Sequence, residues 1–397
     1  MKRSCSAVIG SIRKPGLFLL LTLCFQNISF TQIQPETPSP EQKIVRREAT
    51  RLPAKVQVAT MEQRVLSGWG GGKAEDVVPK AAEIGFAELV VHHEDSTNFA
   101  RFIELGKQRG MGIYAWLFLG DIPAWKKAYP DFEPPLQVMS ATEDEALRRI
   151  QADKTPGKSR YQFGGEPVNE MEVLETPLLC FHDPRVIEAF KKQIDEMLNF
   201  PGVKGVALDY IGYRNYRSCL CQTSRLQFAV YQEQHPELSR ELALDRFSLE
   251  TLVAFNNRLS AYVKTVSPAA QVITHIYPVY LPEPLYGNRL NLDVCVQTAA
   301  WFFDPFWNTN KIKAYARVIA QEANRYHSRP HGAALIGYGK YPVKSGARLT
   351  AELQAILDGG CTRVHVCSLN DVLNTPEAAQ VFRRFFGNPN GKNAAGK

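Results

Sequence analysis

The sequence lacks most of the features that would assign a function at once. The formal charge is +7, but no dense stripe of Lys and Arg occurs, so nucleic-acid binding is not indicated. Neither a Cys-x-x-Cys pair nor a c-type haem motif is present. Cys219 and Cys221 lack further ligands at the spacing of a zinc site, so we expect no metal and no cofactor. A disulfide that includes one of them stays open.

Two short motifs that suggest nucleotide or metal chemistry are also incomplete. The Gly-rich stretch "GWGGGKAED" has Ser67 where a P-loop has its first Gly, and Ala74 where it has Ser or Thr, so it is interpreted as a turn. The stretch "HHED" begins with His92 and His93. Adjacent residues of a regular strand face opposite sides, so these two cannot both bind one metal ion. A metal-dependent hydrolase is therefore disfavoured.

The N-terminal segment has the pattern of a secretory signal peptide. A basic leader precedes the apolar run Gly16–Phe25, which is too short to span a bilayer comfortably, and small residues precede Gln32. We expect residues 1–31 to be a signal peptide of a bacterial protein exported to the periplasm or the extracellular space. No transmembrane segment is expected after cleavage, and Leu23 disfavours a lipid anchor at Cys24.

The composition then leaves room for one large domain. Residues 32–54 are polar and contain Pro, as in a flexible linker, and residues 387–397 have the composition of a disordered tail. The segment 55–386 between them has ample hydrophobic content and the size of an α/β barrel. The sequence does not fix an oligomeric state.

Strand-like and helix-like segments alternate along this domain. Eight apolar runs are strand candidates, and they cover 64–69, 87–93, 112–119, 202–209, 271–277, 293–301, 332–339 and 362–369. The clearest helix begins at Pro184 after an Asp183 N-cap and carries one apolar stripe. The alternation predicts an α/β fold, a (β/α)8 TIM barrel, with long loops after strands 3 and 4.

The fourth strand candidate ends in an acid. In "GVALDY", branched Val206 and Leu208 share one face, while Gly205, Ala207 and Asp209 share the other. Small residues fit the crowded interior of a barrel and branched ones face the helices. Asp209 is therefore predicted to point into the C-terminal mouth, where such barrels keep their active sites.

Other strand ends contribute polar and aromatic side chains to the same mouth. The same inspection places Gln297 and Trp301 on the side of Asp209 and Val294 and Val296 on the outside, with Arg363 and His365 inward. His275 ends the fifth strand, Tyr338 and Lys340 end the seventh, and Trp116 lies in the third. Their convergence predicts a binding site.

Two stretches resemble a known family. "GMGIYAWLFL" and "FHDPRVIEAFKKQIDEMLNFPGVKGVALDYIGY" are similar to the third strand and the next unit of family 10-type glycosyl hydrolase-like TIM barrels of bacterial exported proteins. Gly212 stands where that family commonly has Arg, and Arg214 where Pro is common. The resemblance implies a barrel that acts on a poly- or oligosaccharide as an O-glycosyl hydrolase.

Glycoside hydrolysis requires two carboxyl groups that flank the scissile bond. Asp209 is the first candidate, and Asp304 in "WFFDPFW" is the preferred acid because surrounding rings would raise its pKa. Glu94, Asp95 and Glu283 are rivals, and a loop-capping role for Asp304 stays open.

Aromatic side chains around these acids suit stacking against sugar faces. Tyr210, Tyr213, Tyr216, Trp301, Phe302, Phe303, Phe306 and Trp307 are the candidates, with Arg214 among them as a polar contact. About half of these rings are expected to serve loop packing instead. The alternative function is a non-catalytic carbohydrate-binding or cell-surface protein that kept the barrel without the second carboxylate.

Overall fold

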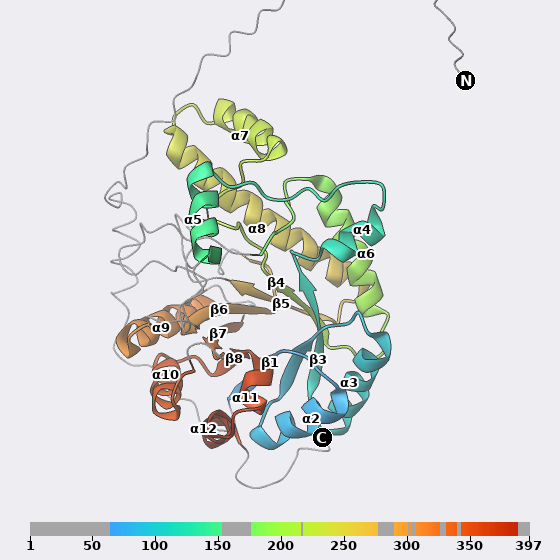
Figure 1. Cartoon of the computed structure of the whole chain (residues 1–397), viewed down its shortest axis with the longest axis vertical. Coiled ribbons are helices and arrows are strands. Elements are labelled where there is room, and N and C mark those ends of the chain that lie inside the picture. Colours follow the sequence, from blue (N-terminus) through green and yellow to red (C-terminus); the bar gives the residue numbers. More distant parts are fainter. Residues whose placement is uncertain are drawn as a thin grey trace, which may run out of the picture. The chain divides into compact units, whose positions relative to one another are not determined.

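The chain folds into a closed barrel of eight parallel strands (Figure 1). The computed structural model describes residues 64–152, 176–215, 217–276, 290–300, 302, 306–325, 331–339 and 343–387. The strands are β1 (Val65–Trp69), β2 (Glu88–Val91), β3 (Gly112–Phe118), β4 (Gly205–Asp209), β5 (Gln271–Ile276), β6 (Val294–Ala300), β7 (His331–Gly337) and β8 (Arg363–Cys367). Each strand pairs with its neighbour in the sequence, and β8 pairs with β1. The predicted (β/α)8 barrel is confirmed.

Helices alternate with the strands and surround them (Figure 1). They are α2 (Ala74–Ile84), α3 (Ser96–Gln108), α4 (Ile122–Ala128), α5 (Ala141–Ala152), α6 (Pro184–Leu198), α7 (Gln222–Gln234), α8 (Arg240–Val266), α9 (Thr309–Arg325), α10 (Gly346–Asp358), α11 (Leu369–Leu373) and α12 (Pro376–Phe386). The β3–α6 connection carries α4 and α5, and the stretch after β4 carries α7. The predicted long loops therefore contain helices of their own.

Local sequence signals set the position of α6, which precedes the acid-bearing strand. The Asp183 side chain accepts a hydrogen bond from the Arg185 amide, and Pro184 occupies the first turn, where no amide donor is required. The stripe of Ile187, Phe190, Ile194 and Met197 is buried. These features fix where the chain enters β4, which follows α6 after a short turn.

Two apolar layers separate the inside of the barrel from its outside. The interior cluster contains only strand residues, namely Trp69, Val90, Tyr114, Ala207, Ile273, Val294, Val296, Ala333 and Leu335. The outer cluster joins the opposite strand faces to the helices and includes Val206, Leu208, Val364 and Val366. The facing predicted for β4 and β8 is therefore confirmed.

A buried ion cluster closes the N-terminal end of the barrel. Glu88 accepts hydrogen bonds from Ser67 Oγ at 2.6 Å and Lys204 Nζ at 2.7 Å, and it pairs with Arg363. Burial raises the pKa of Glu88, but the charges of Arg363 and Lys204 outweigh it and lower the pKa to about 2. This end is filled by paired charges, so we assign it to stability.

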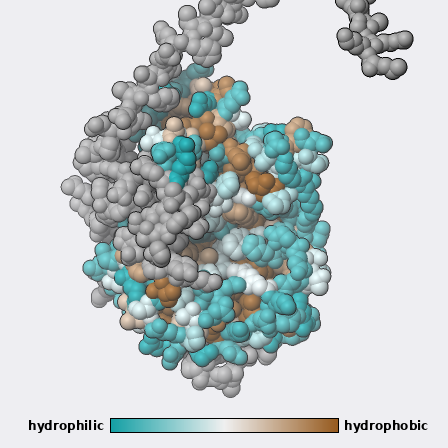
Figure 2. Space-filling model, viewed as in Figure 1, coloured by the Kyte–Doolittle hydropathy of each residue, from teal (hydrophilic) through white to brown (hydrophobic). Residues whose placement is uncertain are grey.

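The described surface in Figure 2 is mainly hydrophilic, with hydrophobic residues in smaller patches. Leu226 and Val230 on α7 are among the exposed large apolar side chains. None of the helices in the described ranges is both long and apolar enough to cross a membrane.

Candidate functional site

Asp209 lies inside the barrel at the C-terminal end of β4 and is 3% exposed. Its Oδ1 accepts hydrogen bonds from the Tyr210 amide at 2.8 Å and pairs with His275 Nδ1 at 3.0 Å. Its Oδ2 accepts from Trp116 Nε1 at 3.1 Å. Both oxygens thus act as acceptors, and the group is held in one orientation by donors from three parts of the chain.

The backbone directly after Asp209 is unusual. Tyr210 has φ +56°, in the left-handed region that side chains other than Gly rarely adopt. This conformation directs the Tyr210 amide back to Asp209 Oδ1, while its ring contacts Phe118 edge-on with centroids 4.9 Å apart. A backbone conformation of this kind costs about 1–3 kcal/mol and concentrates at functional sites. It gives Asp209 a donor that no side chain supplies.

His275 links Asp209 to the next strand. Its Nδ1 faces Asp209 Oδ1 and its Nε2 lies 3.0 Å from Thr298 Oγ1 of β6. His275 is buried, and Thr298 is fully buried. The three side chains form a hydrogen-bonded series, Asp209–His275–Thr298, across β4, β5 and β6.

An aromatic wall closes the opposite side of Asp209. The Trp116 ring stacks on His92 with centroids 4.5 Å apart, and it meets Trp69 edge-on at 5.5 Å. Trp69 is buried at the end of β1, and its Nε1 donates to His365 Nδ1 at 2.8 Å. Trp116 therefore has one face stacked on His92, an edge-on contact with Trp69, and its N–H group bonded to Asp209.

His365 is a neutral imidazole at the centre of the barrel. Burial and then the Arg363 charge lower the pKa of His365 to about 3. Because Nδ1 accepts from Trp69, the remaining proton resides on Nε2. Among the described residues, Nε2 has no hydrogen-bond partner. His365 thus positions Trp69 and holds one unsatisfied donor inside the barrel.

Glu94, one of the rival acids, contacts this wall through His92. Its Oε1 is 3.6 Å from Nδ1 of His92, the residue stacked on Trp116. Interaction with His92 lowers the pKa of Glu94 to about 2. Glu94 is therefore ionised at neutral pH and has the wrong protonation state for a general acid.

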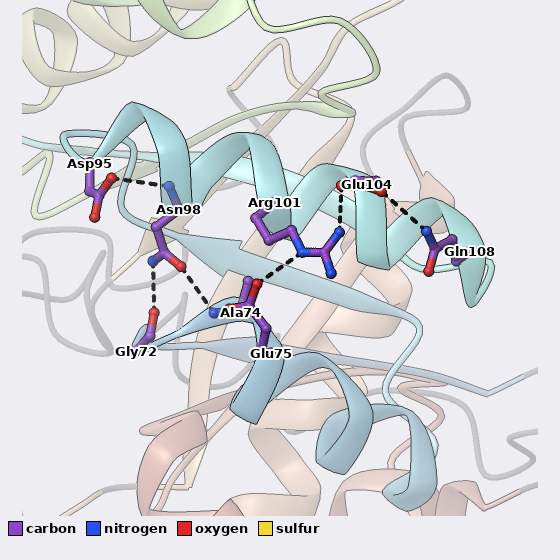
Figure 3. Close-up of polar contacts among 8 residues, drawn as sticks. All are labelled: Gly72, Ala74, Glu75, Asp95, Asn98, Arg101, Glu104 and Gln108. Carbon is purple, nitrogen blue, oxygen red and sulfur yellow. Dashed lines mark hydrogen bonds and ion pairs between the residues drawn. The ribbon is translucent and has the colours of Figure 1, made fainter.

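Asp95 has a structural role instead. Its side chain caps α3 by accepting a hydrogen bond from the Asn98 amide at 3.0 Å (Figure 3). Asn98 in turn accepts from the Ala74 amide at 3.0 Å and donates to the Gly72 carbonyl at 2.8 Å, so it ties the start of α2 to α3. This capping role explains why Asp95 stands at this position, and no catalytic role is needed to explain it.

The prediction for β6 was wrong in its facing. Val294 and Val296 lie in the interior cluster, and Cys295 lies in the outer one. Gln297 pairs in register with Ile276, which faces the helices, so Gln297 points away from Asp209. It is buried in the outer layer and is not placed to contact a substrate in the barrel mouth.

Two predicted tyrosines also lie in the outer layer. The Tyr213 hydroxyl donates to the Ser248 carbonyl at 3.2 Å and lies 2.8 Å from His182 Nε2, so Tyr213 packs between the stretch before α6 and α8. Tyr338 alternates with inward Gly337 and is buried in the outer cluster. Both were predicted as substrate contacts, and burial against helices corrects that prediction.

Three further predicted contacts, Arg214, Phe306 and Trp307, are also held by other parts of the chain. Arg214 is half-buried, and its amide donates to Gln137 Oε1 at 2.9 Å, which ties it to the β3–α6 connection. Trp307 packs on Tyr315 and Lys311 of α9, and Phe306 lies against Lys344 and Arg348. These two rings serve packing, as expected for about half of the aromatic residues.

Several predicted residues lie outside the described residues. They are Trp301, Asp304 and Lys340, together with Tyr216, Glu283 and Phe303. The segments predicted as a signal peptide, 1–31, and as a linker, 32–54, also lie outside the described residues. These assignments stay predictions.

Three members of the site were missed by sequence reasoning. Trp69 ends the first strand and Thr298 lies in the sixth, and period-2 facing from a correct register would have included both. His92 was considered only as a metal ligand. Its contact with Trp116 depends on how the chain leaves β2, for which the sequence carries no local signal.

No family model matches the sequence, and no curated protein matches it either. Solved structures do match it. β-Galactosidase from Bacillus circulans sp. alkalophilus is 15% identical with a TM-score of 0.53, over 81% of this chain and 56% of that one. β-Galactosidase from Halorubrum lacusprofundi is 12% identical with a TM-score of 0.53, over 81% and 58%.

The catalytic domain of β-amylase from Paenibacillus polymyxa is also similar. It is 10% identical with a TM-score of 0.52, over 83% of this chain and 99% of that domain. The chain spans a little more than half the length of the β-galactosidases it matches. The class defined here is a (β/α)8 barrel with distant structural similarity to glycoside hydrolases, and no specific family is assigned.

Proposed function

We propose that this protein is a glycoside hydrolase in which the Asp209 carboxylate stabilises the transition state. One observation carries the proposal: Asp209 stands inside the C-terminal end of the barrel with three donors on its oxygens. A fixed carboxylate of this kind stabilises the oxocarbenium-like transition state of glycosidic bond cleavage. The similarity of the fold to β-galactosidases and a β-amylase supports carbohydrate as the substrate class.

The proposal assigns supporting roles to the neighbours of Asp209. Trp116 and His275 are positioning residues that set the carboxylate plane, because each donates to a different oxygen. Asp304 is the proposed general acid, since Glu94 is ionised at neutral pH. The exposed faces of the aromatic wall, with His92 at its outer edge, are the proposed stacking surface for a sugar ring.

A second candidate is a carbohydrate-binding protein without hydrolytic activity. It is favoured by the environment of the described acids, because Asp209 is almost completely buried, Glu94 is exposed and ionised, and Asp95 caps a helix. Such a protein would use the aromatic wall for binding and Asp209 only to hold Trp116 and His275.

The deciding experiment measures reducing-sugar release from a panel of polysaccharides and oligosaccharides by the purified full chain. Asp209→Asn is compared with Asp358→Asn, which removes an acid from the surface of α10. Release that is lost in Asp209→Asn and kept in Asp358→Asn supports the hydrolase. If no substrate is cleaved but the native chain is retained on an immobilised glycan, the hydrolase is rejected in favour of the binding protein.

A further inference from the structure

Three cysteines that are far apart in the sequence meet on the outer side of the barrel. Cys180 directly precedes α6, while Cys219 and Cys221 lie between β4 and α7. Cys180 Sγ lies 3.6 Å from Cys219 Sγ and 3.4 Å from Cys221 Sγ, and all three sulfur atoms lie within 4.8 Å of one another. Cys180 and Cys219 are buried and Cys221 is half-buried.

The backbone around this cluster is arranged as it is around metal-bound thiolates. The amide of Val138 points at Cys219 Sγ at 3.4 Å, and the Cys221 amide does so at 3.5 Å. The Ser224 amide points at Cys221 Sγ at 3.4 Å, where Cys221 caps the N-terminus of α7. Amide donors and the N-terminal end of a helix both stabilise negative charge on sulfur.

The sulfur–sulfur distances fit a shared metal ion better than a disulfide. A disulfide requires about 2.05 Å between its sulfur atoms and uses only two of the three thiols. Two thiolates bound to one tetrahedral Zn²⁺ at about 2.3 Å each lie about 3.8 Å apart. The two closest pairs here, at 3.4 and 3.6 Å, need only small shifts to reach that value.

We propose that Cys180, Cys219 and Cys221 form a structural zinc site. As the metal binds, each thiol gives up its proton to solvent and its sulfur forms one bond to Zn²⁺, with no change of oxidation state. Soft thiolates select zinc over Mg²⁺ or Ca²⁺. No metal was expected from the sequence because Cys219 and Cys221 lack further ligands at the spacing of a zinc site. The third thiol, Cys180, lies 39 residues before Cys219 and belongs to no short motif.

Ser224 is the candidate for the fourth ligand of the site. Its Oγ lies 3.1 Å from Cys221 Sγ and 3.5 Å from Cys180 Sγ, and the side chain is buried. An oxygen and a sulfur that share a tetrahedral Zn²⁺ lie about 3.6 Å apart. The Ser224 hydroxyl, or a water held by it, is thus placed to complete the coordination.

The proposed site joins three stretches of chain that surround the barrel rim. The Leu220 amide donates to the Val138 carbonyl at 2.8 Å, and the Cys180 amide donates to the Pro135 carbonyl at 2.6 Å. The metal ion would fasten these stretches to the start of α7. One of them is the segment that leaves Asp209, so the site supports the backbone next to the candidate active site without contacting it.

The first test is the metal content of the full chain, purified under reducing conditions and incubated with Zn²⁺ before removal of excess ion. We expect about one zinc per chain. Replacement by Co²⁺ should give the charge-transfer bands of thiolate ligands and the visible bands of a tetrahedral site. Less than 0.1 zinc per chain, or a disulfide between two of these cysteines in the zinc-treated protein, would overturn the proposal.

The second test uses matched variants. Cys180→Ala should lose the zinc. The control Cys361→Ala removes a buried thiol that donates a hydrogen bond to the Ala316 carbonyl, and it should keep the zinc. Ser224→Cys should bind zinc at least tenfold more tightly, because a fourth thiolate replaces a hydroxyl. This gain does not depend on the folding of Cys180→Ala. Zinc retained by Cys180→Ala, or no gain in Ser224→Cys, would refute the assigned ligands.

Discussion

His275 Nδ1 lies 3.0 Å from Asp209 Oδ1, and both side chains are buried inside the barrel. This contact crosses from β4 to β5 and continues to Thr298 on β6. It makes the orientation of the Asp209 carboxylate depend on a residue from another strand.

Replacing His275 with Phe should therefore affect both stability and the proposed activity. The change removes a hydrogen bond to Asp209 and leaves Thr298 without its imidazole partner, which costs roughly 1–3 kcal/mol in the free energy of unfolding. Urea unfolding measures this loss. The control is His235→Phe at the C-cap of α7, where the new ring keeps the contact with Tyr231 and stability should change little. Equal stability of the two variants would contradict a structural role for His275.

Trp116→Phe separates the ring from its N–H group. The phenyl ring keeps contacts with Trp69 and His92, but Asp209 Oδ2 loses its donor. If Asp209 acts in hydrolysis, sugar release by the folded variant should fall by about tenfold or more, and the lost hydrogen bond should lower the free energy of unfolding by roughly 1–3 kcal/mol. Trp307→Phe removes similar volume from the outer layer and should keep full activity. A similar loss in both variants would argue that ring volume matters and the donor does not.

Acid should weaken the N-terminal end of the barrel through Glu88. Its pKa is about 2 in the folded state, against an ordinary value of 4.5. Between these values the unfolded chain binds a proton that the folded chain does not. The stabilisation is thus complete above about pH 5 and is lost as the pH falls toward 2.

Glu88→Gln should remove this dependence and lower the free energy of unfolding at neutral pH by roughly 3 kcal/mol. Unfolding curves from pH 7 to pH 3 test both statements. Glu104→Gln is the control, since it alters only exposed contacts with Arg101 and Gln108 and should have no measurable effect. A native protein whose stability is flat over this range would contradict the assignment.

Two glycines near the site should differ sharply in their tolerance of Ala. A Cβ atom on Gly205 would lie 1.9 Å from the Gln271 carbonyl oxygen of the neighbouring strand, whereas one on Gly212 meets nothing within 4 Å. Gly205→Ala should destabilise the protein by roughly 3 kcal/mol or more, and Gly212→Ala by a few tenths at most. Thermal unfolding of both variants measures the contrast. Similar melting temperatures would show that the β4–β5 contact can relax.

The fold was predictable because the apolar residues of the sequence repeat with the period of a strand and of a helix where the structure has those elements. In β4, small and branched residues alternate, so the inward face could be identified. In β6 this signal fails, since a parallel strand is covered on both faces and Val, Cys and Gln carry no preference between them. The register of β6 also shifts between Thr298 and Ala300, which breaks simple alternation.

The parts of the site that could not be predicted depend on contacts between distant segments. Asp209, His275 and Trp116 each end or lie in a strand, so their convergence follows from the barrel itself. The thiol cluster does not follow from any strand. It requires the stretch before α6 to meet the stretch before α7, and no spacing in the sequence encodes that approach.

The closure of the barrel has a consequence for the order of folding. Trp69 on β1 receives its partner His365 from β8, 296 positions later in the chain. During synthesis β1 therefore cannot pair with β8, and the Trp69 indole cannot bond to His365, until nearly the whole domain has emerged. Contacts of such long sequence separation form slowly. A ribosome that stops short of β8 would release a chain in which the wall beside Asp209 cannot be completed.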